Sequence, residues 1–149
     1  MAEKSEIIAI GCDHAGYRLK EYLKNKISEW GFEIADFGTF SEESVDYPDM
    51  IHPLAKAVDS GGRKWGIILC GSGNGVAMVA NKYPGVRAAL CWNREIALLA
   101  RQHNNANILA LPARFISDEE AEQTVKAFLE TPFEGGRHER RVKKIAPGN

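Results

Sequence analysis

The stretch that most constrains this chain is WGIILCGSGNG, residues 65–75, in which a short apolar run ends at Cys70 and opens into three alternating glycines. The apolar run at 67–69 is typical of a buried strand, and the apolar residues from Val76 onward indicate a helix. We therefore predict a strand-to-helix turn over residues 70–75. Such a turn directs backbone N–H groups at one position, so we expect a bound anion beside the Cys70 thiol.

The same alternation of strand and helix recurs along the chain. Strands are predicted near residues 6–11, 32–37, 67–69, 86–91 and 108–111, with helices near 15–30, 48–60, from 76, 93–103 and from 117. Five such units imply right-handed crossovers and a parallel sheet covered by helices on both faces. We predict one α/β domain over residues 1–149, a doubly wound, Rossmann-like, five-stranded parallel sheet whose basic tail, 134–149, extends from the core.

The composition excludes several classes of function. A chain of 149 residues with 44% hydrophobic side chains and a net charge of -1 fits one domain, and it gives no reason to propose nucleic acid or an anionic membrane as a partner. No apolar run is long enough for a secretory signal or a spanning helix, so we expect a cytoplasmic protein. We also expect no cofactor.

The three cysteines, Cys12, Cys70 and Cys91, show neither CxxC nor metal-finger spacing, so we predict no disulfide framework and no metal. A site made of these cysteines and His14 is disfavoured, because zinc ligands usually occur in closely spaced pairs. Cys70 differs from the other two, since the adjoining glycine turn and helix start should lower the pKa of its thiol. Cys12 and Cys91 are more simply explained as packed core residues.

Ligands of open parallel sheets bind outside the carboxyl ends of the strands. This rule selects the segments at 12–14, 70–75, 91–93 and 112–114. Asp13 and His14 are candidates for this site, but it is equally consistent with the sequence that Asp13 is a helix N-cap and His14 is merely exposed. His103 and Asn104 end a helix, so topology places them at the opposite edge; they take part only if that helix bends or if they serve a neighbouring subunit.

The ligand is predicted to be a small phosphorylated molecule. GSGNG is neither the GxGxxG dinucleotide pattern nor a GxxxxGK[ST] loop, which argues against NAD and nucleoside triphosphates. In the tail, two glycines precede a cationic cluster of Arg137, His138, Arg140 and Arg141. Such a cluster is usually a solvated surface, but arginines match a phosphate bidentately and the glycines supply a hinge.

With these residues in place, the chain resembles the type B ribose-5-phosphate isomerases and the related galactose-6-phosphate isomerase subunits. Motifs spread over nearly its whole length carry the resemblance: GCDHAGYRLK at 11–20, DYPD at 46–49, CGSGNGVAMVANKYPGVRAA at 70–89, RQHNNANILAL at 101–111 and EGGRHERRV at 134–142.

The resemblance implies aldose–ketose isomerisation of a sugar phosphate without a metal, through a cis-enediolate, with ribose 5-phosphate as the first choice of substrate. Cys70 is then the base, Ser72 holds the oxyanion, and His103 moves protons during ring opening. The resemblance also implies three sets of substrate contacts. The oxyanion-binding amides are those of Gly71, Gly73, Asn74 and Gly75, and the sugar-binding residues are Asp13, Tyr47 and Asn104. The phosphate-binding residues are His14, Arg114, Arg137 and Arg141. In the family two subunits complete each site, which implies a homodimer or a dimer of dimers, with the tail reaching a neighbouring subunit.

Departures from the commonest family pattern leave alternatives open. Val76 stands where some members have a glutamate base, which favours the cysteine form of the mechanism. Trp92 and Pro112 lie in segments that differ from the type enzymes, so a six-carbon sugar phosphate is the nearest variant substrate. A non-catalytic sensor of sugar phosphates needs the anion site but no reactive thiol, and a thiol-dependent hydrolase or redox protein needs a second catalytic group beside Cys70.

Overall fold

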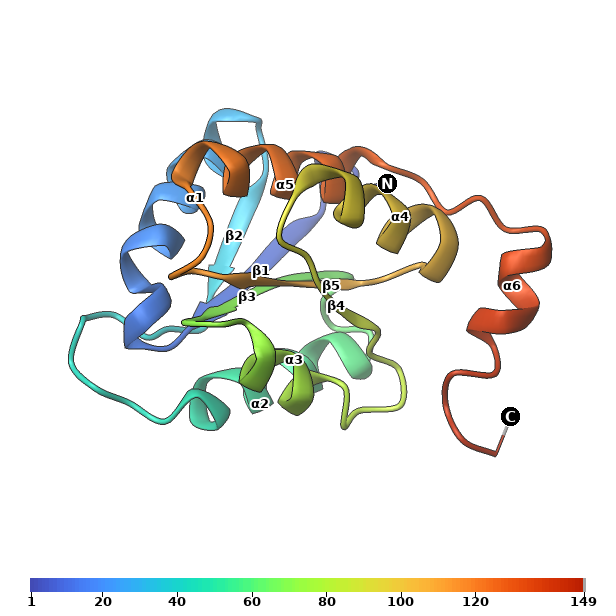
Figure 1. Cartoon of the computed structure of the whole chain (residues 1–149), viewed down its shortest axis with the longest axis horizontal. Helices are drawn as coiled ribbons and strands as arrows, with labels where there is room; N and C mark the ends of the chain where they lie inside the picture. The colour runs from blue at the N-terminus through green and yellow to red at the C-terminus, as the bar shows by residue number, and fades with distance from the viewer. Residues whose placement is uncertain (149) are drawn as a thin grey trace.

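The computed structural model describes residues 1–148, and its centre is a five-stranded parallel sheet in the order β2-β1-β3-β5-β4 (Figure 1). Helices cover both faces of this sheet, so the predicted α/β fold is confirmed. In chain order the elements are β1 (Ile7–Cys12), the 3-10 turn η1 (His14–Gly16), α1 (Tyr17–Glu29), β2 (Glu33–Asp36), α2 (Tyr47–Asp59), β3 (Trp65–Cys70), α3 (Asn74–Ala80), β4 (Ala88–Leu90), α4 (Arg94–Asn104), β5 (Ile108–Pro112), α5 (Asp118–Glu130) and α6 (Arg137–Val142).

Alternate residues of β3 pack into two different core layers. Ile67 and Leu69 belong to the layer beneath α1, α4 and α5, whereas Ile68 and Cys70 belong to the layer beneath α2 and α3. Every residue of β3 is buried, because the strand lies between β1 and β5 and both of its faces are covered. This explains the uninterrupted apolar run that precedes Cys70.

Two element boundaries differ from the prediction. The helix after β3 begins at Asn74 instead of Val76, because Gly73 turns the chain with φ of +78° and Ser72 Oγ accepts a hydrogen bond from Asn74 N. The fourth strand is limited to Ala88–Leu90, since the Arg87 N–H donates to the Asn107 side chain and not to the sheet.

The sheet has a topological switch point between β1 and β3. From β1 the chain crosses by α1 to β2 on one side, and then by α2 to β3 on the other side. The loops that leave the carboxyl ends of β1 and β3 therefore diverge, and open α/β sheets bind their ligands at such a position. The residues after these two strands are the ones placed there.

The tail lies beside the end of α4 and outside the two helical layers (Figure 1). Its first residue, Glu134, donates its backbone N–H to Gln102 O at 3.1 Å. The tail thus contacts its own subunit, and the arginines at 137 and 141 are exposed. Among residues 1–148 no helix has the length and apolar character needed to cross a membrane.

A buried ion pair fastens α1 to the end of β2. The fully buried Lys20 Nζ lies 2.8 and 2.7 Å from the two carboxylate oxygens of Asp36, which also accepts from Gly38 N at 2.8 Å. Burial raises the pKa of Asp36, but hydrogen bonds from Lys20, Lys24 and Gly38 outweigh it and hold that pKa below its ordinary value. The charged carboxylate is therefore the form that stabilises the fold.

We expect Asp36→Asn to lower the free energy of unfolding by about 3 kcal/mol, because it leaves the buried Lys20 ammonium without its main partner. Since the pKa is depressed in the folded state, this contribution is complete above about pH 4 and is lost as the pH falls through the folded-state pKa. Urea unfolding at pH 7 and at lower pH measures both effects. Glu21→Gln, which alters a more exposed partner of Lys20, is the control and should cost less than about 1 kcal/mol. Equal losses in the two variants would contradict the assignment.

Candidate functional site

Side chains from four loops meet at the carboxyl edge of the sheet. Asp13 and His14 follow β1, Cys70 ends β3, Tyr47 begins α2 and Arg114 follows β5. The loops are joined by backbone hydrogen bonds, from Asp13 N to Leu69 O at 3.2 Å and from Arg114 N to Gly71 O at 3.0 Å. The structure therefore brings together the residues that the strand-end rule selected after the first, third and fifth strands.

Cys70 ends β3 and is the cysteine that adjoins the glycine turn. Its side chain is 5% exposed, and its carbonyl accepts from Ala113 N at 2.9 Å. Cys12 and Cys91 are fully buried in the opposite core layer, where burial raises the pKa of each thiol to about 12. Their predicted role as packed core residues is confirmed, and among residues 1–148 the three cysteines do not gather with His14 into a metal-binding group.

The glycine turn directs backbone donors at the space beside Cys70. Gly73 is in the left-handed region, and a Cβ there would lie 2.4 Å from Leu90 Cδ1, so this position has no room for a side chain. The amides of Gly75 and Val76 fall in the first turn of α3, where a helix offers them no acceptor. These N–H groups are suited to a negatively charged oxygen.

Two side chains close over the turn because glycines leave room for them. A Cβ on Gly75 would lie 2.6 Å from Tyr47 Cζ, and a Cβ on Gly71 would lie 3.3 Å from Arg114 Nη1. The Tyr47 ring thus borders one side of the turn and the Arg114 guanidinium borders another. Together they give the site a cationic group and an aromatic wall.

Asp13 and His14 are both held in place by the backbone. Asp13 Oδ1 accepts from Ala15 N at 3.0 Å and Gly16 N at 3.3 Å, so the N-cap interpretation is confirmed. His14 is half-buried, and its Nδ1 accepts from Val45 N at 3.1 Å, so the prediction of a merely exposed histidine is wrong. With Nδ1 as acceptor, the neutral ring carries its proton on Nε2, which leaves a hydrogen-bond donor available.

His103 and Asn104 lie at the other edge of the sheet. The α4 helix ends at Asn104, and Asn105 O accepts from Arg87 Nε at 2.8 Å just before β4 begins. The end of α4 is thus next to the amino end of a strand, and a bend toward Cys70 within the same subunit is ruled out. The α6 helix, which contains Arg137 and Arg141, is at this end as well (Figure 1).

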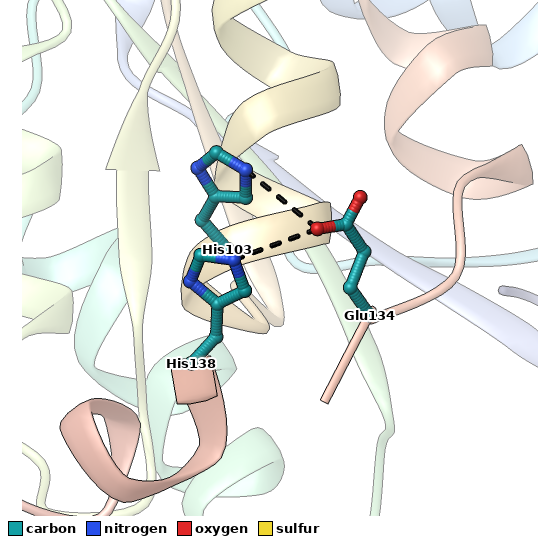
Figure 2. A group of neighbouring side chains, drawn as sticks. All are labelled: His103, Glu134 and His138. Atoms are coloured by element: carbon teal, nitrogen blue, oxygen red, sulfur yellow. Dashed lines mark ion pairs between the residues drawn. The ribbon is translucent and has the colours of Figure 1, made fainter. Parts of the chain in front are cut away.

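A cluster that the sequence patterns did not predict surrounds His103. Its imidazole stacks on that of His138, and both rings lie beside the carboxylate of Glu134 (Figure 2). The sequence grouped His138 with the tail arginines only. Glu134 and His138 are four residues apart, a spacing that indicates proximity only within a helix, and the two glycines between them argue against a helix. His103 is brought to them only by the fold.

Comparison with known proteins identifies relatives over almost the whole chain. A family model described as Ribose/Galactose Isomerase matches residues 8–145. Ribose-5-phosphate isomerase B of Escherichia coli is 44% identical over 93% of this chain and 93% of its own. D-erythrulose-4-phosphate isomerase of Pectobacterium atrosepticum is 40% identical over 93% of this chain and 91% of its own. The crystal structure of ribose-5-phosphate isomerase B from Mycoplasma genitalium with bound ribulose-5-phosphate is 42% identical and superposes with a TM-score of 0.91 over 95% of each chain.

We expect Gly73→Ala to reduce the free energy of unfolding by roughly 2–4 kcal/mol, through left-handed strain plus the clash with Leu90. Gly61→Ala is the matched control, because Gly61 has φ of +84° but no atom within 4 Å of the position that a Cβ would take, so only the strain of about 1–2 kcal/mol applies. Thermal and urea unfolding of both variants separate the two effects. Equal costs would show that close packing does not constrain the turn.

Proposed function

The chain belongs to the ribose/galactose isomerase family, and we propose that it interconverts the aldose and ketose forms of a phosphorylated sugar. The observation that carries this proposal is the glycine turn at the sheet's switch point, where N–H donors flank the thiol of Cys70. Isomerisation through an enediolate needs both a base and donors for a developing oxyanion. The Escherichia coli relative, named for ribose-5-phosphate isomerisation, supports the reaction type.

The proposed substrates are ribose 5-phosphate and ribulose 5-phosphate. Their support comes from the names of several relatives and from the ribulose-5-phosphate bound to the Mycoplasma genitalium protein. The erythrulose-4-phosphate isomerase is nearly as similar to this chain, so membership of the family does not by itself determine the length of the sugar. A six-carbon sugar phosphate is the alternative substrate, and Trp92 and Pro112 are the positions that would reshape the pocket for it.

In the proposed mechanism the Cys70 thiolate removes the proton from C2 of the open-chain aldose, and the electron pair of that C–H bond forms the C1=C2 bond of a cis-enediolate. Ser72 and the amides of Gly71, Gly73 and Gly75 hold the developing oxyanion, and the Asn74 amide, which donates to Ser72 Oγ, orients that hydroxyl. The C2 hydroxyl proton then passes to the C1 oxygen, and the thiol returns its own proton to C1 as the C2=O bond forms, which gives the ketose. Asp13 and Tyr47 bind sugar hydroxyls, and His14 donates from Nε2 to the phosphate.

A second subunit supplies the remaining groups in this proposal. His103 would transfer protons during ring opening and Asn104 would hold a hydroxyl, yet both lie at the edge opposite Cys70 in their own chain. An apolar surface beside the turn supports the pairing of two copies: Met78 and Trp92 are 66% and 54% exposed, and a cavity runs between Met78 and Leu90. Arg137 and Arg141 would then join Arg114 around the phosphate of the neighbouring site.

Replacing the proposed base tests the reaction itself. We expect Cys70→Ala to lower kcat about 10²–10⁴-fold while ribose 5-phosphate still binds, because the variant removes the proton carrier but leaves the anion site. Exchange of the C1 and C2 protons, followed by NMR, measures the step directly. Cys91→Ala is the matched control and should retain turnover, since Cys91 is buried in the other layer. Normal proton exchange in folded Cys70→Ala would show that Cys70 is not the base. Binding of the sugar phosphate without turnover in the unaltered protein would favour the non-catalytic sensor.

Mixing two inactive variants tests whether subunits share sites. In a dimer of one Cys70→Ala chain and one His103→Asn chain, one site carries both changes and the other carries neither. Statistical mixing after co-refolding should therefore restore about a quarter of the original activity per dimer. Each variant refolded alone is the control. No recovery in a mixture shown to contain heterodimers would mean that Cys70 and His103 do not cooperate across an interface.

A further inference from the structure

Three potential metal ligands meet where the tail passes α4. Glu134 Oε1 lies 3.7 Å from His103 Nε2 and 3.5 Å from His138 Nε2. The two imidazole rings are stacked, with centroids 4.2 Å apart and planes inclined by 12°. Figure 2 shows that both rings present a nitrogen to the same carboxylate oxygen. One ligand atom from each residue falls within 4.8 Å of the other two.

The backbone holds these residues together independently of their side chains. Glu134 N donates to Gln102 O at 3.1 Å, which places the start of the tail beside the last turn of α4. Gly135 and Gly136 then adopt positive φ values of 68° and 57°, and the chain turns into α6 with His138 near its start. The cluster is thus formed by the fold and does not depend on a chance meeting of long surface side chains.

We propose that His103, Glu134 and His138 form a binding site for a transition-metal ion such as Zn²⁺. A tetrahedral zinc site with three protein ligands and one water has bonds of about 2.0–2.1 Å, which puts its ligand atoms about 3.4 Å apart. The distances of 3.5 and 3.7 Å to Glu134 are close to this separation, and coordination also requires the two stacked rings to rotate so that both nitrogens point at the ion. Side-chain exposures of 41%, 49% and 15% leave a path for the ion and its water.

The same distances are too long for hydrogen bonds. Hydrogen bonds between imidazole and carboxylate have donor–acceptor distances of about 2.7–3.2 Å. The ion-pair contacts made by Glu134 are longer than this, so no hydrogen bond joins the carboxylate to either ring. An ion at the centre satisfies all three at once, which a single proton on either ring does not do.

The ligand set selects the kind of metal. Two imidazole nitrogens and one carboxylate suit zinc, copper, nickel or cobalt, whereas calcium and magnesium prefer oxygen ligands only. The adjacent positive charges of Arg137 and Arg141 disfavour a hard cation that is held mainly by charge.

Metal binding at this position has a consequence that rests on the proposed function. A metal on His103 Nε2 occupies the lone pair with which that ring would accept and return protons during ring opening. It also links the tail to α4 of its own subunit through Glu134 and His138. Zinc should therefore inhibit the isomerase reversibly, and a chelator should restore activity.

Titration of the metal-free protein with Zn²⁺ by calorimetry, and with Co²⁺ by visible absorption, tests the site without reference to activity. We expect one ion per chain and the absorption of tetrahedral cobalt. His138→Gln and Glu134→Gln should each weaken binding at least about tenfold. His52→Gln is the matched control, because His52 pairs with Tyr83 outside the cluster and its loss should leave affinity unchanged.

Absence of binding at stoichiometric metal, or equal affinity in the His138→Gln, Glu134→Gln and His52→Gln variants, would overturn the site. Circular dichroism of each variant verifies that the fold is retained. Assays of sugar-phosphate turnover with zinc then separate the two proposals. Inhibition that His138→Gln relieves supports both, whereas stoichiometric binding without inhibition keeps the metal site and rejects the role of His103 in catalysis.

Discussion

The burial of β3 on both faces is the constraint on which the rest of the structure depends. All six of its residues are buried, and β1 and β5 pair with it on either side. Such a strand tolerates only apolar or small side chains, so a reactive group can first appear where the strand ends. That group is Cys70. Because the neighbouring strands are parallel, their own ends bring Asp13, His14 and Arg114 to the same edge.

The same topology separates Cys70 from His103. A crossover helix runs antiparallel to the strands that it connects, so α4 must end at the edge opposite the thiol. Arg101 keeps it there: its guanidinium lies over the Trp65 ring at 4.6 Å and donates to the carbonyl groups of Thr131 and Ala106. Burial, and then the charge of Arg87, lowers the pKa of Arg101 to about 10, which still leaves it charged at neutral pH. The proposed cooperation between Cys70 and His103 therefore requires two chains and not a movement within one.

Sequence patterns predicted the parts of the molecule that depend on local chemistry and on burial. The alternation of apolar runs was sufficient to predict the sheet and its helical layers. The glycines that follow Cys70 were sufficient to predict the strand-to-helix turn. The extent of β4 was not predictable, because it depends on the Arg87–Asn107 hydrogen bond between segments twenty residues apart. The cluster of His103, Glu134 and His138 was missed for the same reason, since no spacing along the chain connects His103 to the other two.

The proposed isomerase site and the proposed metal site both depend on the conformation of the glycines in the tail. His103 is on a helix end fixed by Arg101, whereas Glu134 and His138 flank Gly135 and Gly136, where neither glycine has an atom within 4 Å of a Cβ position. This hinge sets the position of the metal ligands and also the reach of Arg137 and Arg141 toward a neighbouring phosphate. If one hinge conformation suits the metal and another suits the phosphate, each ligand weakens the binding of the other by the same factor. Competition between metal and sugar phosphate then follows from the hinge, in addition to their shared use of His103.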